Sequence, residues 1–102
     1  MSISLTYTPA QTVSVTTAEL TIMGASSWTG ADPNLNQDRQ YEVTNNGSTD
    51  VYIGTVAGSV STNYCRKIAS GETQIVFVRG GESLLVVRAS STGNVTARGV
   101  GF

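Results

Sequence analysis

Hydrophobic and polar residues alternate with a period of two along most of the chain. Ile3, Leu5 and Tyr7, for example, are separated by Ser4 and Thr6. Such alternation is typical of β-strands with one buried and one solvated face, and no segment of convincing length has a helical period. We therefore predict strands at residues 3–7, 12–16, 20–22, 41–43, 51–53, 73–79, 83–89 and 94–98.

Short turn signals separate several of these predicted strands. They are Asn46-Gly47, Ser70-Gly71, Gly80-Gly81 and Thr92-Gly93. Such short connections favour antiparallel strands, because a parallel pair needs a crossover of about a dozen residues or more. The sequence predicts an all-β fold, a single antiparallel β-sandwich or jelly roll of about eight short strands, with residues 1–102 as one domain.

The stretch YEVTNNGSTDVYIG, residues 41–54, reads as a hairpin around the Asn-Gly turn. On this interpretation Tyr41, Val43, Val51 and Ile53 face the core, and residues 45–50 form an exposed turn.

Two predicted strands, QIVFV and LLVV, are apolar on both faces. A sandwich strand ordinarily keeps one face in water, so the outer face of these strands is expected to be covered. Either a long loop of the same chain or a second subunit could cover it. Val76, Val78, Leu85 and Val87 are the candidate interface residues in this region, and the pattern leaves open which face of each strand is the outer one.

Residues 24–40 form the longest stretch without periodicity, and we predict a long loop there. The loop contains Leu35 and the single tryptophan, Trp28, which complete the set of candidate interface residues. Trp28 either makes such a contact or folds back over the open end of the sandwich.

The chain carries little charge. Only 13% of its 102 residues are Asp, Glu, Lys or Arg, and the net charge is −1. Direct binding to nucleic acid or to a membrane surface is not expected, because both depend on clustered basic residues. No run of about 18 apolar residues could span a bilayer, and no secretory signal is recognisable at the N-terminus.

The sequence contains no recognisable catalytic or cofactor site. Histidine is absent, and the single cysteine, Cys65, therefore has no histidine partner for nucleophilic catalysis. Residues 32–38 place oxygen ligands at alternate positions, but Gln37 and Val43 stand where a calcium loop needs glycine and glutamate. We predict no enzyme activity, no metal and no cofactor.

Three arginines, Arg79, Arg88 and Arg98, lie at or near the ends of the last three predicted strands. They form either one stripe that meets an acidic partner or a solvated rim.

The C-terminal three-fifths of the chain combines an aromatic-led strand, an Asn-Gly turn, a second aromatic strand, a Ser-Gly-Glu turn and a closing glycine-rich strand. The segments are YEVTNNGSTDVYIG, KIASGETQIVFVRGGESLLVVRAS and GNVTARGVGF. In this succession the sequence resembles small β-sandwich virion proteins of tailed bacteriophages, including capsid decoration (cement) proteins.

The resemblance implies a non-enzymatic structural protein that binds and stabilises an assembled shell. It also implies a homo-oligomer, a trimer or a dimer, with a major capsid protein or another virion protein as partner. Such a protein is made in the host cytoplasm and resides in the virion.

A carbohydrate-binding or adhesive sandwich is the alternative interpretation. It rests on Trp28, Tyr41, Tyr52 and Tyr64, because exposed aromatic rings can stack on sugars. This alternative requires those rings to lie on the surface.

Overall fold

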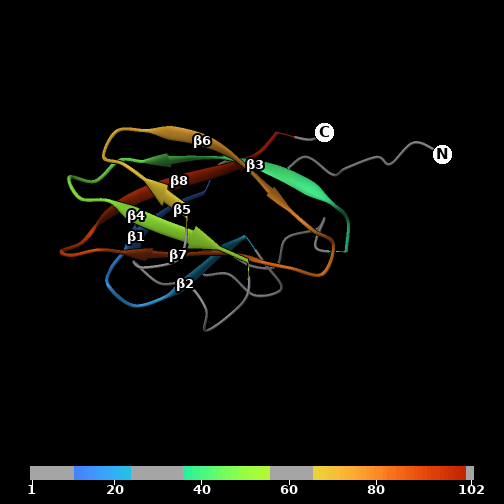
Figure 1. The fold of residues 1–102 in the computed structure, drawn as a ribbon, viewed down its shortest axis with the longest axis horizontal. Coiled ribbons are helices and arrows are strands. Elements are labelled where there is room, and N and C mark those ends of the chain that lie inside the picture. Colours follow the sequence, from blue (N-terminus) through green and yellow to red (C-terminus); the bar gives the residue numbers. More distant parts are fainter. Residues whose placement is uncertain (1–10, 24–35, 56–65, 101–102) are drawn as a thin grey trace.

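The computed structural model describes residues 11–23, 36–55 and 66–100, whose strands form two sheets packed face to face (Figure 1). Sheet A has the strand order β1-β8-β3-β6 and sheet B the order β2-β7-β4-β5, and all pairs are antiparallel. The strands are β1 (Gln11–Val15), β2 (Leu20–Met23), β3 (Arg39–Asn45), β4 (Val51–Gly54), β5 (Arg66–Ile68), β6 (Thr73–Val78), β7 (Leu84–Arg88) and β8 (Gly93–Gly99). The predicted all-β sandwich is confirmed. Within these ranges, no helix has the length and apolar character needed to cross a bilayer.

The strand order is that of a jelly roll. The first strand pairs with the eighth, the second with the seventh, the third with the sixth and the fourth with the fifth. Successive pairs lie in alternate sheets, as when one long antiparallel ribbon is wrapped around a core. Most connections therefore cross from one sheet to the other.

The core lies between the sheets and is built from every second residue of the strands. Burial alternates strictly along β3 and along β4, as the period of two requires. The buried cluster comprises Val13, Val15, Ile22, Tyr41, Val43, Val51, Ile53, Ile68, Val76, Val78, Leu84, Val86, Val95 and Ala97. The prediction that Tyr41, Val43, Val51 and Ile53 face the core is confirmed.

Residues 41–54 do not form the predicted hairpin, because β3 belongs to sheet A and β4 to sheet B. Asn45, which we predicted to begin an exposed turn, is fully buried. Its side-chain Nδ2 donates to the carbonyl oxygens of Thr49 (2.8 Å) and Ile68 (3.0 Å), and its Oδ1 accepts a hydrogen bond from the Gly47 amide (3.0 Å). The Asn-Gly pair does lie between two strands as predicted, but the connection runs from sheet A to sheet B and does not close a hairpin within one sheet.

The guanidinium of Arg88, at the end of β7, is buried and fastens one end of the sandwich. It donates to the carbonyl oxygens of Val15 (3.2 Å), Thr49 (2.6 Å) and Asn94 (3.4 Å), and to Oδ1 of Asn45 (3.1 Å). These acceptors come from β1, from β8, and from the end of β3 and the connection that follows it. One side chain of sheet B therefore fixes three segments at one end of sheet A.

Arg88 is a buried cation whose hydrogen-bond acceptors are neutral oxygens. Burial lowers the pKa of Arg88 from its usual value. Arginine nevertheless remains protonated near neutral pH, and the hydrogen bonds to main-chain and amide oxygens offset the lost hydration. The arginines predicted to form one stripe or one rim are thus divided, because Arg88 is buried whereas Arg79 and Arg98 are exposed.

Two glycines make room for this guanidinium. A Cβ atom on Gly47 would lie 2.5 Å from Nη1 of Arg88, and one on Gly93 would lie 3.1 Å from its Cζ. Gly47 does not have a positive φ, so close approach explains the glycine better than backbone conformation does. The Asn-Gly and Thr-Gly turns therefore shape the arginine site.

Replacing Arg88 tests this arrangement. We expect Arg88→Met to lower the free energy of unfolding by about 3 kcal/mol or more, because several buried acceptors lose their donor. Arg98→Met is the matched control. Arg98 is exposed and makes a surface ion pair, so its loss is expected to change stability by less than about 1 kcal/mol. Urea denaturation of both variants measures the difference, and equal effects would contradict the role of Arg88.

Candidate interaction surface

The candidate residues on β6 lie on the face that packs against sheet B. Val76 is 6% exposed and Val78 is fully buried, and both belong to the core cluster. The apolar residues of β6 that lie on the outer face are Ile75 and Phe77, which are 47% and 48% exposed. Alternation identified two apolar faces but did not show which one faced the other sheet.

The other candidate residues are either buried or outside the described residues. Leu85 and Val87 are buried, although they are not part of the core cluster between the sheets. β7 is thus covered on both faces, as we expected for a doubly apolar strand. Trp28 and Leu35 lie outside the described residues.

Large exposed hydrophobic residues gather at one end of sheet A. In the described part of the chain they are Ile75, Phe77 and Val100, and we call them the apolar patch. Strand register brings them together. Phe77 is opposite Gln40 on one side, and the Val100 amide donates to the carbonyl oxygen of Gln40 on the other side (3.1 Å). Since neighbouring strands lie about 4.8 Å apart, Phe77 and Val100 are separated by roughly 10 Å across β3.

The next row of the same face carries an ion pair beside the patch. Glu42 lies between Ile75 on β6 and Arg98 on β8. Nε of Arg98 is 3.2 Å from Oε1 of Glu42, and both side chains retain solvent contact. The patch therefore sets apolar side chains beside Gln40 and a charged pair, and protein-binding surfaces combine apolar and polar groups in this way.

The other half of this face is polar and internally hydrogen-bonded. The hydroxyls of Thr12 and Thr96 lie 2.9 Å apart, and those of Thr44 and Thr73 lie 2.8 Å apart. Nδ2 of Asn46 donates to the Thr96 hydroxyl (2.8 Å). Such ladders satisfy the hydrogen-bonding capacity of these side chains across the strands.

β6 is also the edge strand of sheet A. The Asn45 amide donates to the carbonyl oxygen of Glu72 (3.0 Å), and the register between β6 and β3 is unbroken from Thr73 to Val78. In an antiparallel pair every second residue hydrogen-bonds to the neighbouring strand, so Glu72, Gln74, Val76 and Val78 face β3. The amide and carbonyl groups of Thr73 and Ile75 consequently point away from β3. Among the described strands, none pairs with this edge.

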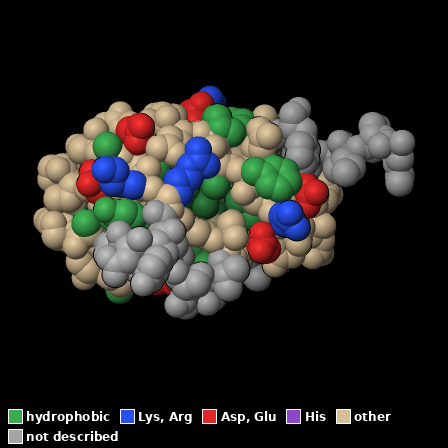
Figure 2. Space-filling model, viewed as in Figure 1, with side chains coloured by type: hydrophobic (Ala, Val, Ile, Leu, Met, Phe, Trp, Pro, Cys, Tyr) green, Lys and Arg blue, Asp and Glu red, His purple; other side chains and the backbone are tan. Residues whose placement is uncertain are grey.

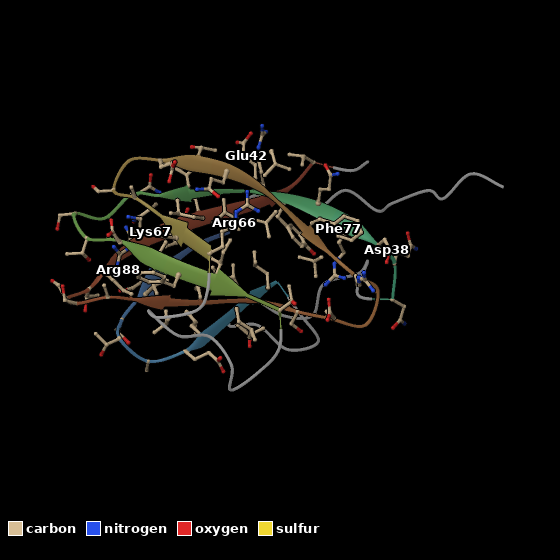
Figure 3. The ribbon with its side chains drawn as sticks, viewed as in Figure 1. Asp38, Glu42, Arg66, Lys67, Phe77 and Arg88 are labelled. Carbon is tan, nitrogen blue, oxygen red and sulfur yellow. The ribbon has the colours of Figure 1, made fainter. Side chains whose placement is uncertain are left out.

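Both ends of β6 are held in place by side chains. At the C-terminal end, the buried Arg39 donates to the carbonyl oxygens of Gln37 (3.2 Å), Arg79 (3.1 Å) and Glu82. The Asp38 carboxylate accepts from the Gly80 amide (2.8 Å). Figure 3 shows Phe77 and Asp38 toward this end of the sandwich and Arg88 toward the other.

At the N-terminal end of β6, Glu72 closes the turn that precedes the strand. Its Oε1 accepts from the Ala69 amide (2.9 Å) and from Nε2 of Gln74 (3.0 Å). These two hydrogen bonds, followed by the charges of Lys67 and Arg66, lower the pKa of Glu72 below its usual value of 4.5.

The visible face of the molecule carries small separate groups of hydrophobic, basic and acidic side chains on a largely uncharged background (Figure 2). In the described ranges, no cluster of three or more His, Cys, Asp or Glu residues is placed to hold a metal ion. The arrangement that the described residues do provide is an apolar patch along a sheet edge, which can bind another protein surface.

Comparison with known proteins identified no matching family model, no curated relative and no similar solved structure.

The depressed pKa of Glu72 predicts a pH dependence of stability. The ionised carboxylate stabilises the turn fully above its unfolded-state pKa, near 4.5, and this contribution is lost as the pH falls through the lower folded-state value. We therefore expect Glu72→Gln to reduce stability at pH 7 and to differ less from the wild type at pH 3. Urea denaturation at both pH values measures this, with Glu82→Gln as the control for the change in net charge. A difference that is equal at the two pH values would contradict the assignment.

Proposed function

We propose that the chain is a non-enzymatic structural protein that decorates an assembled protein shell, as the capsid cement proteins of tailed bacteriophages do. The apolar patch of Ile75, Phe77 and Val100 is the observation that carries the proposal. A surface group of this kind, set in a chain with few charges, favours contact with protein over contact with a polyanion.

The fold is compatible with this function without assigning it. Jelly rolls occur in viral capsid proteins, and also in lectin domains and cupins. Fold alone does not identify function, so the argument rests on the surface. The patch lies on strands whose ends are fixed by Arg39 and Arg88, which suits a rigid docking surface.

The carbohydrate-binding alternative has less support from the described aromatic residues. Tyr41 is 1% exposed, and its hydroxyl accepts a hydrogen bond from Nε of Arg39 (2.6 Å). It therefore cannot offer a ring face to a sugar. Tyr52 is only partly exposed, and Trp28 and Tyr64 lie outside the described residues.

The proposed function includes the partners and the location that the sequence resemblance implied. The partner is a major capsid protein or another virion protein, the chain itself forms a homo-oligomer, and the protein acts in the virion after synthesis in the host cytoplasm. Binding would stabilise the assembled lattice and not its free subunits, because only the lattice offers many sites at fixed spacing.

Co-sedimentation with shells tests this function. We expect the gene to lie beside a major capsid or portal gene, and the protein to sediment with empty shells assembled from that capsid protein but not with the free subunits. The double variant Phe77→Ser, Val100→Ser is expected to weaken shell binding at least tenfold, because two exposed apolar contacts are lost.

The control is the double variant Thr12→Ser, Thr96→Ser, which changes the polar half of the same face and keeps its hydroxyls. It is expected to bind like the wild type. Wild-type protein that does not sediment with the shells would contradict the proposed function.

A further inference from the structure

We propose that two copies of this chain associate through the edge of β6, in an antiparallel pairing around a two-fold axis at Ile75. Sheet A of each copy would then continue into sheet A of the other, with β6 beside β6 of the second copy. The proposal concerns self-association and does not depend on a shell.

The first observation is that β6 lacks the features that normally prevent edge pairing. The segment TQIVFV contains no charged residue, no proline and no glycine, and its register with β3 is unbroken from Thr73 to Val78. Charged side chains, proline and bulges are the usual devices that blunt an edge strand. The edge of β6 therefore has the properties of a pairing surface.

The other edge strands differ. β5 has three residues, of which Arg66 and Lys67 are charged and exposed, and they lie along that strand in Figure 3. β2 has a register break between Thr21 and Met23. β1 presents the polar side chains of Thr12 and Ser14 on the outer face of sheet A, where β6 presents apolar ones. Among the described edges, β6 is the one suited to pairing.

The second observation is that this edge can pair with a copy of itself without opposing like charges. When two antiparallel copies meet at Ile75, the outer-face residues of the paired strands are Thr73, Ile75 and Phe77, none of which is charged. Arg79 of one copy lies opposite Gly71 of the other, whereas Glu72 lies on the opposite face of the sheet, where it bonds to Gln74. Two Ile75 side chains therefore adjoin at the axis and no like charges meet, which favours a second copy as the partner.

Main-chain geometry allows this register. Residues that pair through hydrogen bonds must both direct their amide and carbonyl groups toward the other strand, and Thr73 and Ile75 direct theirs away from β3. In the paired state Ile75 lies opposite its own copy, and Thr73 lies opposite Phe77. The apolar side chains of both copies then share one face of a continuous sheet.

Sedimentation equilibrium over a concentration series tests the proposal. We expect a reversible dimer of twice the 10.7 kDa chain mass, with a dissociation constant of roughly 1 µM to 1 mM, because a single strand pairing buries little surface. Ile75→Lys places like charges opposite each other and is expected to weaken the dimer at least tenfold. Ser14→Lys on β1 is the matched control and is expected to leave it unchanged.

Cysteine cross-linking tests the axis in a Cys65→Ser background. In a hydrogen-bonded antiparallel pair the Cα atoms lie about 5.5 Å apart, within the range of a disulfide, so Ile75→Cys is expected to form a covalent dimer under mild oxidation. Ser14→Cys is expected to remain monomeric on a non-reducing gel after the same oxidation. The proposal is overturned if the wild type stays monomeric up to about 1 mM, or if only Ser14→Cys cross-links.

Loss of shell binding and loss of the dimer are separate results. The dimer is measured without shells. Because Phe77 lies in the paired strand, the dimerisation of the Phe77 and Val100 double variant is measured first, so that a loss of shell binding is separated from a loss of the dimer. A chain that dimerises but does not bind shells would contradict the proposed function alone.

Discussion

The buried guanidinium of Arg88 is the interaction on which the rest of the sandwich depends. It extends from sheet B and donates to Val15, Thr49 and Asn94 carbonyl oxygens around sheet A. An apolar side chain could fill the same space but could not satisfy these acceptors, and buried carbonyl groups without donors are costly. Gly47 and Gly93 remain small because a Cβ atom on either would press on this group.

Arg39 performs a related function at the other end. Its hydrogen bonds to the connection between β6 and β7 fix the point where the edge strand leaves sheet A. Two buried arginines therefore hold the two ends of a jelly roll in which most connections pass between sheets. Because most of the acceptors are main-chain carbonyl groups, these hydrogen bonds fix the connections between the strands.

The outer face of sheet A has two halves of different chemistry. The threonine half satisfies its own hydroxyls across the strands, whereas the half with Ile75, Phe77 and Val100 leaves apolar surface in contact with water. The apolar half also includes the edge of β6. The surface proposed to contact a shell and the edge proposed to pair with a second copy therefore adjoin each other.

The sequence predicted the fold class and most of the core because alternation depends on local pattern alone. Tyr41, Val43, Val51 and Ile53 face the core as expected. It did not predict the partners of the strands, since an Asn-Gly turn looks alike whether it closes a hairpin or crosses between sheets. For the same reason, alternation alone could not decide whether Val76 and Val78 or Ile75 and Phe77 face the core.

The buried arginines were also missed for a physical reason. A charged residue at a strand end is normally solvated, and only the convergence of distant carbonyl groups makes its burial favourable. The glycines at positions 47 and 93 were a local signal of that crowding, but their contact with Arg88 appears only in three dimensions. The exposed patch could have been found from the pairing of Ile75 with Glu42, had the register been known.

Amide hydrogen exchange at Ile75 tests the central claim, that the edge of β6 is an interaction surface, most directly. This amide points away from β3, so it exchanges rapidly in a single chain and slowly when another strand pairs with it. The account predicts protection that increases with protein concentration, while the Val76 amide, paired with β3, is protected throughout. Rapid exchange at Ile75 at every concentration, or protection that does not change with concentration, would contradict it.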